Sequence, residues 1–143
     1  MKFLKIILSI SAFVLFINEI NAQEFYSFIG KSKTNLTNQL GAPGNIQRTN
    51  TSTVYQYYNS STENTIYAVQ NSKVYMAVKS IKSYSESTAK SNSSVQILNY
   101  LALGFTKQGT ESGMIILKKG KRVLSIGYMN NSDGTYSTLV TAY

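Results

Sequence analysis

The acidic side chains are the first residues that could carry out chemistry in this chain. The sequence contains no histidine and no cysteine. It therefore lacks the usual proton-transfer group near neutral pH, and thiol catalysis, thiolate metal sites and disulfides are excluded. After residue 22 the acids are few and widely spaced, namely Glu24, Glu63, Glu86, Glu111 and Asp133. We expect no catalytic residues, metal site or cofactor. A hydrolase in which two of these carboxylates converge in space is the remaining enzymatic alternative.

Positive charge is the second chemical feature. The net charge is +8, and most of the basic residues are spread along the chain. One run is concentrated, and it comprises Lys118, Lys119, Lys121 and Arg122 around Gly120. Apolar residues flank this run on both sides, so we expect the tip of a polar hairpin. Such a tip could bind an acidic glycan or a lipid headgroup, or it could simply be solvated.

Tyrosine is the third feature, with eleven copies and no tryptophan. Tyr55, Tyr57, Tyr67 and Tyr75 fall on predicted strands. Tyrosines on a solvated sheet face favour contact with a protein partner, whereas the same residues packed inward would simply fill the core. Tyr75 is the strongest candidate, because its neighbours Val74 and Met76 alternate to the other face.

The N-terminus has the layout of a secretory signal peptide. Lys2 and Lys5 are basic, 6–17 is apolar except for two serines, and Ala22 is a small residue at a plausible cleavage point. The apolar run is shorter than the roughly 20 residues that span a bilayer. We expect residues 1–22 to be cleaved and residues 23–143 to form one exported domain, periplasmic or secreted. Export also argues against a nucleic-acid partner.

Two halves of the chain repeat one order of elements. A short helix with Leu36 and Leu40 on one face is bounded by Ser32 or Thr34 and by Gly41. Apolar residues from Val95 to Phe105 predict a second helix, capped by Ser93 or Ser94. Three strands follow each helix, at 53–58, 64–70 and 73–83, and then at 113–117, 122–129 and 135–142. Asn71-Ser72 is expected to turn between two of them.

This order predicts an α+β fold with two layers, in which both helices pack on one face of an antiparallel sheet (αβββ-αβββ). A tandem duplication would account for the repeated order. The expected core residues are, from the helices, Leu36, Leu40, Val95, Leu98, Leu101 and Phe105, and, from the sheet, Val74, Met76, Val78, Ile115, Leu117, Ile126 and Val140.

The stretch from Gly30 to Pro43 reads Gly-Lys-Ser-Lys-x-x-Leu-x-x-x-Leu-Gly-x-Pro. It resembles the helix-and-turn signature of the BamE/SmpA outer-membrane assembly lipoproteins, although the lipidated cysteine is missing. The tandem helix-then-sheet order is similar to the group that contains β-lactamase inhibitor protein, although its disulfide cysteines are missing. Both resemblances imply a small exported α/β module that binds other proteins through a sheet face and loops.

These observations together favour a non-enzymatic, exported binding module with an envelope or extracellular protein as its partner. Binding of an anionic glycan or of lipid headgroups through the basic hairpin is the alternative.

Overall fold

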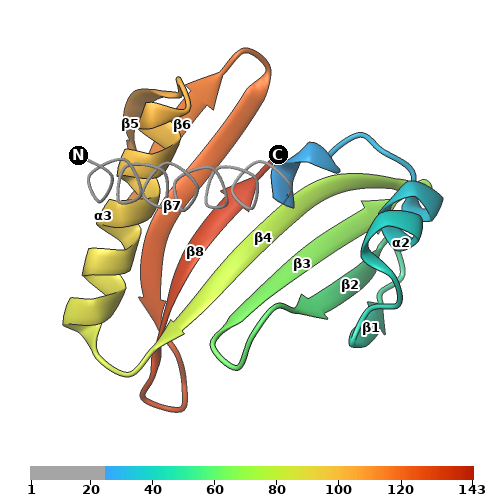
Figure 1. The fold of residues 1–143 in the computed structure, drawn as a ribbon, viewed down its shortest axis with the longest axis horizontal. Helices are drawn as coiled ribbons and strands as arrows, with labels where there is room; N and C mark the ends of the chain where they lie inside the picture. Colours follow the sequence, from blue (N-terminus) through green and yellow to red (C-terminus); the bar gives the residue numbers. More distant parts are fainter. Residues whose placement is uncertain (1–24) are drawn as a thin grey trace, which may run out of the picture.

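The computed structural model describes residues 25–143. The predicted signal peptide and Glu24 therefore lie outside the described residues. The fold is α+β, and most of it is one antiparallel sheet of eight strands. Figure 1 shows the strands side by side in the order β1-β2-β3-β4-β8-β7-β6-β5, so that β4 and β8 meet at the centre.

The elements follow one another in two similar series. The first series is α2 (Lys33–Leu40), β1 (Asn45–Arg48), β2 (Thr53–Tyr58), β3 (Glu63–Gln70) and β4 (Lys73–Ser83). The second is α3 (Glu86–Ala102), β5 (Thr106–Glu111), β6 (Met114–Lys119), β7 (Arg122–Asn130) and β8 (Tyr136–Ala142). Residues 25–27 are also helical. None of the helices within residues 25–143 is long and apolar enough to span a bilayer.

The predicted number of six strands is wrong, because the sheet has two further strands at its edges. β1 and β5 are the outermost strands, and most of their residues are exposed. Their sequences, Asn-Ile-Gln-Arg and Thr-Lys-Gln-Gly-Thr-Glu, carry almost no apolar residues. An edge strand needs only one neighbour and no buried side chains, so it leaves little signal in the sequence.

Local signals placed α2 and the first hairpin correctly. Ser32 caps α2 and its hydroxyl accepts a hydrogen bond from the Asn35 amide at 3.1 Å. Gly41 ends the helix with a φ of 78°, a value that glycine adopts readily. The two-residue turn at Asn71-Ser72 joins β3 to β4, because Gln70 pairs with Lys73.

The second helix begins earlier than expected and turns another face inward. The hydroxyl of Ser85, rather than that of Ser93 or Ser94, caps α3 by accepting a hydrogen bond from the Thr88 amide at 3.1 Å. The buried residues of α3 are Ala89, Ser93 and Tyr100. Small side chains let this helix lie close to the sheet, so that the Thr138 hydroxyl donates to the Ala89 carbonyl at 3.0 Å.

The prediction that Val95, Leu98 and Leu101 lie in the core is therefore wrong. Their exposed fractions are 48%, 65% and 38%. Val95 and Leu98 lie on the side of α3 opposite Ser93 and Tyr100, because residues two positions apart on a helix point about 200° apart. Leu101 lies at the flank of the helix, about 100° from Tyr100, and is the least exposed of the three. The apolar stripe in the sequence is real, but the tertiary fold directs it to solvent.

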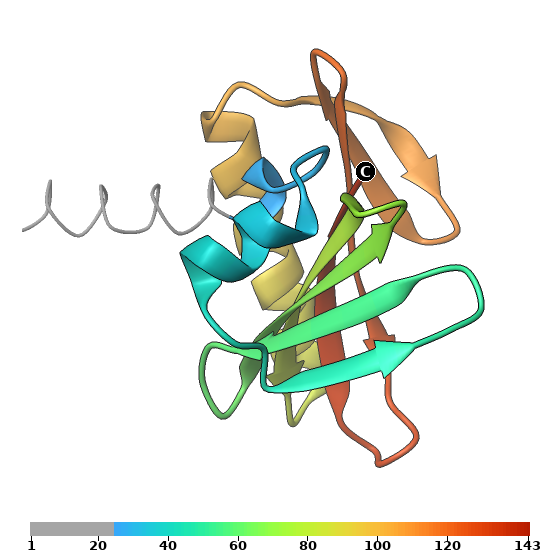
Figure 2. The ribbon, with the colours of Figure 1, turned by 90° about the vertical axis from the view of Figure 1, so that its right-hand side faces the viewer.

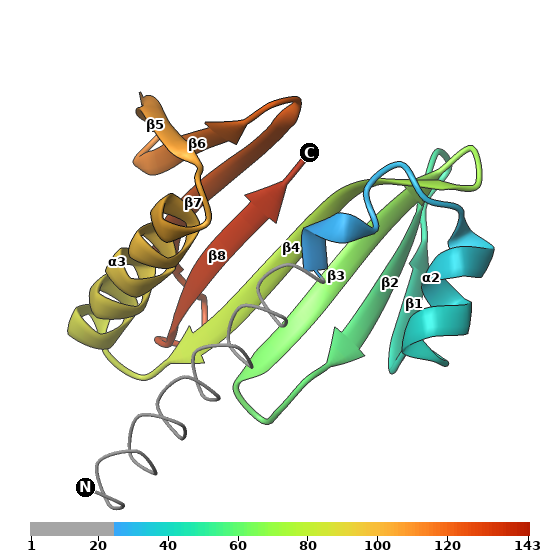
Figure 3. The same ribbon diagram turned by 45° about the horizontal axis from the view of Figure 1, so that its top comes forward.

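The core lies on the helix-bearing face of the sheet. One row of paired residues crosses six strands, and all of its members are buried: Tyr55, Tyr67, Ala77, Ala142, Leu124 and Leu117. Leu36 from α2 and Tyr100 from α3 join the same cluster. Figure 2 shows both helices on one side of the sheet, and Figure 3 shows α3 beside β7 and α2 beside β1 and β2.

The remaining predictions of core residues, from the sheet and from the helices, are partly correct. Val74, Leu117, Ile126, Val140, Leu36 and Phe105 are buried, and Leu40 and Ile115 are partly buried against them. The prediction that Met76 and Val78 lie in the core is wrong. Ala68 pairs with Met76 but Val69 pairs with Val74, so Tyr75 is an extra residue in β4. This β-bulge reverses the alternation, placing Ala77 in the core and Met76 and Val78 on the other face.

Candidate functional site

Three of the four candidate tyrosines lie in the core rather than at the surface. Tyr55, Tyr57 and Tyr67 have exposed fractions of 4%, 9% and 2%. Tyr57 and Tyr67 meet edge-on, with ring centroids 5.9 Å apart, and the Tyr57 hydroxyl donates to the Gly41 carbonyl at 3.3 Å. Burial raises the pKa of Tyr57, so its phenol stays neutral. Only Tyr75, exposed at the bulge, remains available as a contact residue.

The face of the sheet opposite the helices has its own row of paired residues. It runs through Gln56, Ile66, Val78, Thr141, Ser125 and Ile116. Apart from buried Ser125, these side chains are half-buried. Neither α2 nor α3 lies over this face (Figure 2). We call it the open face, and its partly exposed residues include Ile66, Val78 and Leu139.

A groove of about 820 Å³ opens on the helix-bearing face. Phe25 and Leu40 line one part of it, and Tyr57 and Tyr67 line another. Asn59 of the β2–β3 loop, Glu63 and Thr65 near the start of β3, and Lys79 of β4 add polar side chains to the lining.

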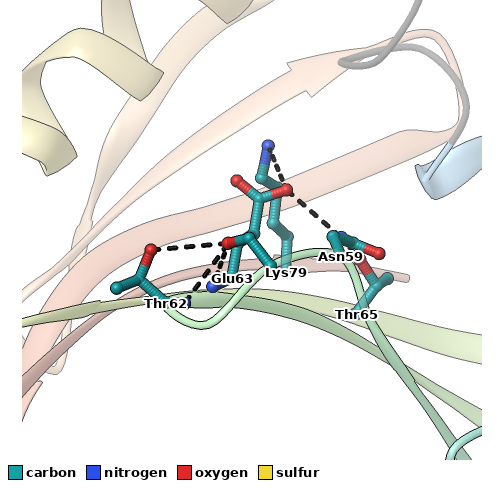
Figure 4. Close-up of polar contacts among 6 residues, drawn as sticks. Asn59, Thr62, Glu63, Thr65 and Lys79 are labelled. Carbon is teal, nitrogen blue, oxygen red and sulfur yellow. Dashed lines mark hydrogen bonds and ion pairs between the residues drawn. The ribbon is translucent and has the colours of Figure 1, made fainter.

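Four of these polar groups form one connected cluster (Figure 4). Lys79 Nζ lies 3.3 Å from Glu63 Oε1. Asn59 Nδ2 donates to the same carboxylate oxygen at 3.2 Å and to Thr65 Oγ1 at 2.9 Å. The Lys79 side chain is only 14% exposed. Lys79 lies opposite Thr65 in the β3–β4 register, and the bulge in β4 turns it toward the helices.

Sequence reasoning did not find this cluster. Asn59 and Glu63 are four residues apart across a loop, but Lys79 is brought to them only by strand pairing. Its position could have been inferred only by recognising the bulge, and the sequence has no clear signal for that. The cluster offers a carboxylate, an ammonium and an amide beside aromatic walls, which suits hydrogen bonding to a polar ligand.

Two of the other acids, Glu86 and Asp133, are held in ion pairs that keep them charged. Lys90 and the Tyr128 hydroxyl hold the pKa of Glu86 below its usual value. Asp133 accepts hydrogen bonds from Thr135 and Lys82, which hold its pKa well below the usual range. Such carboxylates are poor proton donors near neutral pH.

The basic run forms a hairpin tip, as predicted. Lys119 pairs with Arg122 across the two-residue turn Gly120-Lys121. Lys119 Nζ donates to the Leu103 carbonyl at 2.5 Å, and the Arg122 guanidinium lies 5.6 Å from the centre of the Tyr26 ring. Lys118 and Lys121 are exposed. Within residues 25–143 the ion pairs use Lys79, Lys82 and Lys90, so the basic hairpin has no carboxylate partner there.

Comparison of the chain with protein-family models, with curated proteins and with solved structures found no match.

Proposed function

We propose that this chain is a non-enzymatic, exported binding module that docks a protein partner through the open face and its adjoining loops. The observation that carries this proposal is the open face itself. Partly exposed Ile66, Val78 and Leu139 lie there on three neighbouring strands, without a helix over them. Ile66 pairs with Val78, and Leu139 is a diagonal neighbour of Val78 on β8. Partly exposed apolar side chains that gather on an uncovered sheet face are typical of interaction sites.

The charge of the chain indicates the chemistry of the partner. After residue 22 the chain has 12 basic and 5 acidic side chains, so the protein favours a partner whose interface has an acidic rim. Tyr75, at the bulge in β4, adds an aromatic contact residue. The N-terminal basic-apolar-small pattern supports export and therefore an envelope or extracellular partner.

We also propose that the domain is a two-layer, duplicated module related in architecture to the group of β-lactamase inhibitor protein. Each half consists of a helix followed by four strands. From one edge of the sheet to its centre the strands are β1, β2, β3 and β4, and from the other edge to the centre they are β5, β6, β7 and β8. Both halves therefore have their strands in the order of the chain. This order supports a tandem duplication in which β4 and β8 are equivalent strands that pair with each other. The Gly30–Pro43 signature of the assembly lipoproteins supports the same functional class.

An affinity capture experiment tests the docking face. The protein is immobilised and exposed to envelope extracts of its own cells at moderate salt, and captured proteins are identified by mass spectrometry. Val78→Glu and Leu139→Glu place a charge on the open face, and Tyr75→Ala removes the exposed ring. Ile46→Glu is the matched control, because Ile46 is exposed and lies on the other face.

The proposal requires a protein that wild type and Ile46→Glu capture and that the open-face variants lose. Circular dichroism and urea unfolding establish that each variant is folded. Capture that is equal for all folded variants, or no captured protein at all, would overturn docking through this face.

A further inference from the structure

The exposed apolar stripe of α3 lies at the same end of the molecule as the basic hairpin. The stripe consists of Val95, Leu98 and Leu101, which are three residues apart along one side of the helix. The bond from Lys119 Nζ to the Leu103 carbonyl fixes the hairpin tip to the C-terminal end of α3. Figures 1 and 2 show the C-terminal end of α3 and the turn between β6 and β7 at the same end of the fold.

The charged residues of the hairpin tip, 118–122, are all basic. From residue 91 to residue 102, α3 contains no charged side chain. Its one acid, Glu86, is at the far end of the helix and pairs with Lys90. Beyond the helix, Lys118, Lys119, Lys121 and Arg122 follow without a carboxylate partner among the described residues.

We infer that the α3 stripe and the basic hairpin together form a docking surface for an anionic membrane. Charge complementarity identifies this occupant. An anionic bilayer attracts clustered lysines and arginines, and its interface accepts aliphatic side chains from a helix that lies in its plane. A soluble acidic glycan would use the hairpin but would have no use for the apolar stripe. This surface is separate from the open face, so the inference does not depend on the proposed docking of a protein.

Vesicle binding by the purified protein tests the inference, after mass spectrometry has established its N-terminus. The vesicles contain phosphatidylcholine alone or mixed with phosphatidylglycerol in equal parts. Leu98→Ser/Leu101→Ser removes part of the stripe, and Lys118→Glu/Lys121→Glu reverses the free charges of the hairpin. The matched controls are Ile46→Ser, an exposed apolar residue elsewhere, and Arg48→Glu/Lys73→Glu, an equal change of charge elsewhere.

We expect wild type to bind the anionic vesicles and to dissociate as salt is raised, because exposed charges are screened within about 8 Å at physiological ionic strength. Both patch variants should bind about tenfold more weakly, which corresponds to the loss of a few favourable contacts. Both controls and Val78→Glu on the open face should bind as wild type does.

A single tryptophan supplies a second measurement, because the chain has none. Leu98→Trp should shift its emission to the blue when anionic vesicles are added and should be quenched by brominated lipid, whereas Ile46→Trp should do neither. No vesicle binding by wild type, undiminished binding by the stripe variant, or equal weakening by Arg48→Glu/Lys73→Glu would overturn the inference. Binding that depends on the hairpin alone and is abolished by a sulfated polysaccharide would instead assign the hairpin to acidic glycans.

Discussion

Two leucines offer a direct test of how α3 sits on the sheet. Leu124 lies in the buried row on β7 and is fully inaccessible, whereas Leu98 on α3 is 65% exposed. Substitution of each by alanine removes the same three carbon atoms. At Leu124 the change leaves a cavity among Leu117, Ala142 and the residues packed over them. We therefore expect Leu124→Ala to lower the free energy of unfolding by about 2–5 kcal/mol.

The expected effect of Leu98→Ala is within about 0.5 kcal/mol, because most of the side chain already contacts water and alanine is a good helix former. A single domain has roughly 5–15 kcal/mol of stability, so the first loss is large and the second is hardly detectable.

Urea unfolding followed by far-ultraviolet circular dichroism measures both values, and an unchanged slope with urea would show that the comparison is valid. Leu36→Ala, at a fully buried position on α2, is a second core reference. A loss of more than about 2 kcal/mol for Leu98→Ala, or less than about 1 kcal/mol for Leu124→Ala, would refute the placement of the two residues.

Three further predictions concern single side chains. The buried Tyr100 hydroxyl has no hydrogen-bond partner among the described residues. Tyr100→Phe should therefore leave the free energy of unfolding unchanged or raise it by about 1 kcal/mol, which thermal unfolding would show as an equal or higher midpoint. A clear loss of stability would reveal an unseen partner. Ser72 has a φ of 62° in the β3–β4 turn, and Ser72→Gly should stabilise the fold by about 1 kcal/mol in urea unfolding, because glycine adopts this conformation without strain. The pKa of Asp133 is lowered by hydrogen bonds from Thr135 and Lys82, so its contribution to stability is present above the unfolded-state pKa and is lost as the pH falls below about 4. Urea midpoints measured across this range should fall less for Asp133→Asn than for wild type, and identical pH profiles would contradict this assignment.

Much of the first half of the fold could be predicted from local chemistry. Ser32 and Gly41 bound α2 correctly because a cap and a left-handed stop act within a few residues of chain. The β3–β4 turn at Asn71-Ser72 has the same local origin. The basic hairpin could also be predicted, because two apolar runs flank a charged turn.

The candidate surfaces could be predicted only in part. The composition singled out Tyr55, Tyr57 and Tyr67, yet tyrosine suits a core as well as an interface, and the fold uses these three inside. The polar cluster of Glu63 and Lys79 was missed, because strand pairing brings together residues that are far apart in the sequence.

The sequence by itself determined the secondary structure classes, the sheet-rich α+β fold, the absence of histidine and cysteine chemistry, and the position of the basic hairpin. These properties depend on composition and on short-range geometry. Only the tertiary structure decided which face of each element is buried. One extra residue at Tyr75 exchanged the two faces of β4, and small residues at Ala89 and Ser93 turned α3 so that Leu98 reaches solvent. Burial is a property of the whole packed assembly, because an apolar stripe is covered only where another element lies against it.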